Sequence, residues 1–138
     1  MISKGNICRS PFAEALLIRR GLTVRSAGLA VRDGEPADAA AVRAAHRVGI
    51  DLTQHTTSKL RDSQVEWADL ILCMEGWQVE SFTAQWPSAR HKIRLVGDFL
   101  SEPPFGIGDP WGQSDEVFAA TFERLAAGTG RIAQLLGR

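Results

Sequence analysis

The sequence predicts an α/β fold in which a parallel β-sheet is covered by helices on both faces. Segments with the apolar spacing of amphipathic helices alternate with short apolar segments of strand length. Residues 68–74 are apolar apart from Asp69, and such a run is typical of a buried parallel strand. The chain of 138 residues is long enough for one domain with one hydrophobic core.

The first elements follow from local signals near the N-terminus. Only Met1 and Ile2 precede the first loop, so the first strand is expected to be a stub. Pro11 favours the opening of a helix over residues 11–20, which Gly21 ends. Residues 24–30 are then predicted to form a short buried strand.

The middle of the chain continues the alternation. Residues 36–48 predict an alanine-rich helix, and residues 58–67 a short helix with a turn. The strand at 68–74 leads into a helix over residues 77–86, and residues 93–96 predict the last strand. This order of elements places parallel strands beside one another with helices between them.

The C-terminal part begins with an irregular loop. Residues 101–108 contain two prolines and two glycines, which disfavour regular structure. Residues 114–136 predict a long helix, with an expected break at residues 128–130, where two glycines occur.

Composition excludes several classes of function. Lys and Arg number 16, as do Asp and Glu, so no basic surplus indicates nucleic acid and no charge run indicates a membrane surface. Two cysteines cannot support a disulfide scaffold, and the three histidines lack metal-ligand spacing. We therefore expect a cytoplasmic protein without a metal site. Scattered charges such as Glu75 and Glu80 are expected on solvated faces.

The most informative segment is Ser3–Pro11, a polar loop that runs into a helix. Free N–H groups at a helix start and in the loop can point at one spot, which carries about half a positive charge from the helix dipole. Arg9 adds a full positive charge beside it. This arrangement predicts a site for an oxyanion such as inorganic phosphate or sulfate.

The same segment resembles the signature of the low-molecular-weight protein-tyrosine phosphatases, in which Cys is followed by five residues and then Arg-Ser-Pro. The resemblance covers nearly the whole chain, as one phosphatase-like domain over residues 1–138. It implies a three-layer sandwich with a central four-stranded parallel sheet and helices on both faces. It also implies hydrolysis of phosphotyrosine proteins or small aryl phosphates by a phosphocysteine-type mechanism, without a cofactor. The phosphate-binding residues would be Lys4, Gly5, Asn6, Ile7, Cys8, Arg9 and Ser10.

The resemblance also assigns individual roles. Arg9 would bind two phosphate oxygens, and the Ser10 hydroxyl would assist the departure of the nucleophile. Asp109, in an Asp-Pro pair ahead of the last helix, is the expected general acid and later the base. Asn6 would shape the loop with the support of His55. Trp111 would line the cleft, although the family often has a pair of aromatic residues at Trp111-Gly112.

Position 3, where the family has its nucleophilic cysteine, is Ser3. A serine hydroxyl is a weak nucleophile unless a base removes its proton, and no histidine lies nearby in the sequence. We therefore expect phosphate binding to persist while hydrolysis, with Ser3 in the catalytic position, is absent or very slow. Ser3 fits a substrate-trapping substitution as well as a naturally inactive relative.

Three alternatives remain open at this point. The chain could be a non-catalytic phosphate- or phosphotyrosine-binding protein of the same fold. It could be an arsenate reductase, a chemistry that passes oxidation along extra cysteines, of which only Cys8 and Cys73 are present. It could also be a structural module whose anion site stays empty.

Overall fold

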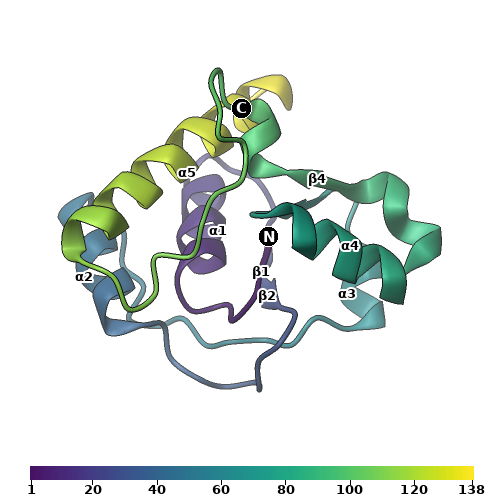
Figure 1. Ribbon diagram of the computed structural model, residues 1–138, viewed down its shortest axis with the longest axis horizontal. Helices are drawn as coiled ribbons and strands as arrows, with labels where there is room; N and C mark the ends of the chain where they lie inside the picture. Colours follow the sequence, from purple (N-terminus) through teal and green to yellow (C-terminus); the bar gives the residue numbers. More distant parts are fainter.

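Four short strands alternate with five α-helices in the computed structural model, which describes residues 1–138 (Figure 1). The strands are β1 (Ile2–Ser3), β2 (Ala27–Gly28), β3 (Ile71–Cys73) and β4 (Ile93–Leu95). The helices are α1 (Arg9–Arg19), α2 (Ala39–Arg47), α3 (Asp62–Trp67), α4 (Gly76–Gln85) and α5 (Asp115–Leu135). Two 3₁₀-helices, η1 (Pro87–Lys92) and η2 (Val96–Phe99), flank β4. The predicted α/β class is confirmed, whereas the two 3₁₀-helices were not anticipated.

The strands form two parallel pairs. β1 pairs with β2, with Ile2 opposite Ala27, and β3 pairs with β4, with Ile71 opposite Ile93. β1 also contacts β3, but no hydrogen-bonded ladder joins them, so the structure has two two-stranded ladders rather than the continuous four-stranded sheet expected. The reason is the length of β1, since two residues offer too few backbone groups to pair along both edges.

The strand expected at residues 24–30 shrinks for the same reason. β2 holds only two residues because β1 provides a partner only that far. The backbone N–H groups of residues 23–26 have no hydrogen-bond partner within the protein. The expected helix at residues 58–67 likewise begins only at Asp62, because Lys59 instead bridges to Gly28.

Two helix boundaries correct the sequence-based expectation. α1 begins at Arg9, so Pro11 is its third residue and not its first. The missing N–H of Pro11 costs no hydrogen bond at this position, because N–H groups in the first turn have no intrahelical partner. α5 runs unbroken through Gly128, where a Cβ would lie 3.0 Å from the carbonyl oxygen of Val96. The glycine therefore allows η2 to pack directly on α5, and this contact outweighs its low helix propensity.

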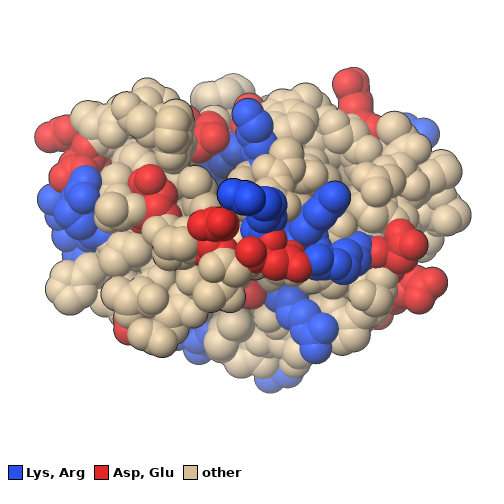
Figure 2. All heavy atoms as spheres, turned by 90° about the horizontal axis from the view of Figure 1, so that it is seen from below, with Lys and Arg blue, Asp and Glu red and all other residues tan.

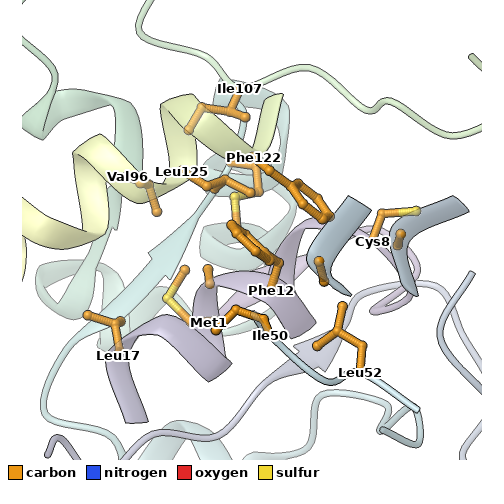
Figure 3. Close-up of a cluster of buried hydrophobic side chains, with 14 of the residues drawn as sticks. Met1, Cys8, Phe12, Leu17, Ile50, Leu52, Val96, Ile107, Phe122 and Leu125 are labelled. Atoms are coloured by element: carbon orange, nitrogen blue, oxygen red, sulfur yellow. The ribbon is translucent and has the colours of Figure 1, made fainter. Parts of the chain in front are cut away.

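Helices cover both sides of the strands (Figure 1). The larger apolar cluster lies against α1, α2 and α5 (Figure 3). In it, the ring of Phe12 stacks on that of Phe122 with 3.9 Å between centroids. The smaller cluster, around Phe82 and Val65, lies beneath α3 and α4. Strand side chains contribute to both clusters, for example Leu72 to the larger and Ile71 to the smaller. The two apolar layers therefore hold the strand ends from which the loops of the site extend.

Candidate active site

The loop from Ser3 to Cys8 connects the end of β1 to the start of α1, and Asn6 sets its shape. Asn6 is buried and has φ of 54°, a left-handed conformation that asparagine tolerates better than most residues. Its amide Nδ2 donates to Ser10 Oγ at 2.8 Å and to Ser26 Oγ at 2.9 Å, and its Oδ1 accepts from the Ser58 amide at 2.9 Å. His55 Nε2 donates to the Asn6 carbonyl at 2.7 Å, so that this histidine supports the loop from behind.

Ser3 lies at the floor of this loop. Its side chain is buried, and its Oγ lies 2.7 Å from Ser10 Oγ and accepts the Asn6 amide at 3.2 Å. No histidine or carboxylate forms a hydrogen bond with Ser3. The arrangement stabilises negative charge on an atom at this position, but it supplies no base that could remove a proton from the hydroxyl.

Arg9 is buried at the other side of the loop, with only 2% of its surface exposed. Its Nη1 donates to Glu75 Oε1 at 2.5 Å and to the Ile107 carbonyl at 2.7 Å. Its Nη2 lies 3.8 Å from Asp109 Oδ2. The guanidinium is therefore held in one orientation before any anion arrives.

Glu75 was expected on a solvated face, and this expectation is wrong, because its carboxylate pairs with the buried Arg9. The available signal was its position directly after the buried strand β3, because ligand sites in parallel sheets lie beyond the carboxyl ends of the strands. Ile107 was also missed, and no local signal could have found it, since its contribution is a backbone carbonyl.

Asp109 and Trp111 close the site from the segment that precedes α5. Asp109 Oδ1 accepts the Trp111 amide at 3.1 Å, while the side chain of Asp109 is 43% exposed. Together with residues 3–9 and Ala30, they line a pocket of about 180 Å³. The predicted residues are thus brought together, except that Ser10 and His55 lie behind the pocket wall. A larger cavity of about 620 Å³, between residues 21–27 and 67–72, contains none of the residues from Ser3 to Arg9.

Charged side chains of both signs share the face of the molecule that carries this loop (Figure 2). The cationic side chains that line the pocket are those of Lys4, which is exposed, and Arg9, which is buried. No group of three or more metal-ligating side chains is placed to hold a metal ion. None of the helices combines the length and apolarity needed to span a bilayer.

Cys8 precedes the first turn of α1 and is buried at the edge of the larger apolar cluster (Figure 3). Burial, with smaller contributions from the charges of Asp38 and Asp109, raises the pKa of Cys8 to about 12. Burial likewise raises the pKa of Cys73 to about 12. Both thiols are therefore protonated at neutral pH and are poor nucleophiles.

We expect neither thiol to react measurably with Ellman's reagent at pH 8 in the folded protein, and both to react within minutes in denaturant. Absorbance of the released thionitrobenzoate measures this. Rapid modification of one thiol in the native protein, with unchanged circular dichroism, would contradict the burial of Cys8 or Cys73.

The family model for low molecular weight phosphotyrosine protein phosphatase matches residues 1–138. The low molecular weight protein-tyrosine-phosphatase Etp of Escherichia coli K12 is 36% identical over 140 residues, which cover 100% of this chain and 93% of Etp.

Two solved structures are closely similar. The tyrosine phosphatase Wzb of Escherichia coli K30 in complex with sulphate superposes with a TM-score of 0.93 at 36% identity, covering 99% of this chain and 95% of Wzb. A Cys-to-Ser mutant of the YwlE arginine phosphatase with a phosphorylated active-site serine has a TM-score of 0.90 at 31% identity, covering 99% and 93%. The matched fold, the full-length family match and the loop geometry agree. This chain belongs to the low molecular weight protein-tyrosine phosphatase family.

Proposed function

We propose that this protein binds phosphotyrosine or small aryl phosphates in the pocket formed by residues 3–9, and that Ser3 takes up the phosphoryl group without rapid release. The observation that carries the proposal is the position of Ser3 Oγ, buried at the floor of an anion-sized pocket opposite the fixed guanidinium of Arg9. Phosphate oxygens would meet the amides of the loop and the free edge of Arg9.

The chemistry is an in-line transfer. Ser3 Oγ forms a bond to phosphorus while the bond from phosphorus to the phenolic oxygen breaks. The Asp109 carboxyl gives its proton to the departing phenolate. Because no basic side chain contacts Ser3, the hydroxyl proton passes to an oxygen of the substrate's own phosphoryl group. Arg9 and the loop amides stabilise the charge on the equatorial oxygens.

The second half of the reaction is the slow one. Water, activated by Asp109, would have to displace a serine alkoxide from phosphorus, and an alkoxide is a much poorer leaving group than a thiolate. The hydrogen bond from Ser10 assists this departure only in part. The phosphorylated serine in the Cys-to-Ser YwlE mutant supports the view that serine can hold a phosphoryl group in such a pocket.

Incubation with p-nitrophenyl phosphate tests the proposal. We expect release of no more than one p-nitrophenol per protein molecule, and one phosphoryl group on the peptide that contains Ser3, detected by mass spectrometry. Ser3→Ala is the control and should remain unlabelled. Labelling that persists in Ser3→Ala would place the acceptor elsewhere and overturn the proposal. A parallel reaction with phosphoarginine, the substrate class that the name of the YwlE relative indicates, tests whether transfer is restricted to phosphate on a phenolic oxygen.

The missing base at Ser3 favours one other function, that of a non-catalytic phosphate- or phosphotyrosine-binding protein. Binding of phosphate by calorimetry, combined with no phosphoryl transfer from any of these substrates over hours, would favour it. Arsenate reduction has less support, because the pKa of each cysteine is raised to about 12 by burial and neither thiol lines the pocket with an exposed sulfur.

A further inference from the structure

The loop that leads to Asp109 has almost no hydrogen bonds of its own. In residues 101–106, the only hydrogen bonds come from Arg124 on α5. Its Nη1 donates to the Gly106 carbonyl at 3.0 Å, and its Nη2 donates to the Pro104 carbonyl. Pro103 and Pro104 have no N–H groups to donate. The guanidinium is therefore the main polar restraint on this segment.

The restrained segment continues directly into the site. Ile107, which is fully buried, donates its N–H to the Met74 carbonyl at 2.8 Å, and its own carbonyl accepts from Arg9. Asp109 follows two residues later. A shift of the Gly106 carbonyl would thus move the adjacent peptide and the carboxylate of Asp109 together.

Packing against η2 also restrains this loop. A Cβ added at Gly97 in η2 would lie 1.4 Å from the carbonyl oxygen of Phe105, so the two backbones are in direct contact. Arg124 draws the loop toward α5 while Gly97 limits its approach to η2. The two restraints together determine where residues 104–107 run.

We infer that Arg124 is a positioning residue for proton transfer by Asp109. A guanidinium can hold two carbonyls with two separate nitrogens, whereas the single ammonium of lysine cannot reproduce this fork. A general acid works only within hydrogen-bond reach of the leaving oxygen, so a displacement of about 1 Å is enough to slow the transfer. Arg124 touches no substrate atom and acts only through the loop. The inference rests on the proposed phosphoryl transfer.

The kinetic test uses a Ser3→Cys background, in which turnover is expected. Arg124→Gln should lower kcat by roughly tenfold for p-nitrophenyl phosphate. The loss should be larger for aryl phosphates whose leaving phenol has a higher pKa, because these depend more on the general acid. The inhibition constant of inorganic phosphate should change less than about threefold, since Glu75 still holds Arg9. Arg124→Lys should recover part of the rate. Arg131→Gln, an exposed arginine on the same helix, is the control and should match the parent.

An equal loss for all leaving groups, or a loss that follows weaker phosphate binding, would overturn the inference. A second measurement does not need turnover. Hydrogen exchange at the Ile107 amide should speed up at least tenfold in Arg124→Gln of the Ser3 protein and stay unchanged in Arg131→Gln. Unchanged protection at Ile107 contradicts the role of Arg124. If the Ser3→Cys protein is inactive but Arg124→Gln still speeds exchange at the Ile107 amide, the proposed function is contradicted and the restraint by Arg124 is supported.

Discussion

Replacing Ser3 with cysteine is expected to raise steady-state hydrolysis of p-nitrophenyl phosphate by roughly a thousandfold or more, because a thiolate is both the better nucleophile and the better leaving group. The Asn6 amide, the Ser10 hydroxyl and the start of α1 all favour negative charge at this position. They should lower the pKa of the new thiol, as such surroundings do at other helix N-termini. Initial rates as a function of substrate concentration and pH measure the gain.

The buried Cys8 provides an internal control for this experiment. Iodoacetate should alkylate the new thiol at position 3 rapidly, and inorganic phosphate should protect it, while Cys8 stays unmodified. A Ser3→Cys protein that binds phosphate but does not turn over would identify the chain as a binding protein whose remaining machinery is also disabled. Equal rates for Ser3→Cys and Ser3→Ala would refute a nucleophile at this position.

The second large effect is expected for Arg9→Lys. The substitution removes the planar fork that contacts Glu75, the Ile107 carbonyl and the pocket at once. A lysine ammonium paired with Glu75 cannot also present two parallel N–H groups to phosphate. We expect the affinity for inorganic phosphate, measured by calorimetry, to fall by about a hundredfold.

The stability of Arg9→Lys should fall as well, by about 2–3 kcal/mol, because the Ile107 carbonyl is buried and loses its partner. Urea unfolding followed by tryptophan fluorescence measures this, and Arg131→Lys on the exposed face of α5 is the matched control. Unchanged phosphate affinity in a folded Arg9→Lys protein would show that the anion binds without Arg9.

The local parts of the site could be predicted from the sequence, because they depend on neighbours along the chain. The loop amides, Asn6 and the start of α1 all belong to one short segment. Glu75 and Ile107 could not be found in this way, since they reach Arg9 across 66 and 98 residues of sequence. Arg124 shows the same limit, because its partners are carbonyls, which every residue carries.

Secondary structure divides along a similar line. Helices with a clear apolar face were predicted because each has its periodicity within itself. The length of β2 was not predicted, since a strand extends only as far as its partner, and β1 ends the pairing of β2 after two residues. The continuity of α5 through Gly128 likewise depends on the contact with Val96, which residue preferences alone do not include.

The fixed orientation of Arg9 has a consequence for the resting protein. Because Glu75 and Ile107 hold the guanidinium already, an arriving ligand has little reorganisation to drive, and binding is favoured even for a small anion that makes few contacts. Free phosphate matches the tetrahedral part of any substrate. It should therefore compete with the proposed phosphotyrosine or aryl phosphate ligand, so that the ambient phosphate concentration sets the fraction of molecules with an empty pocket.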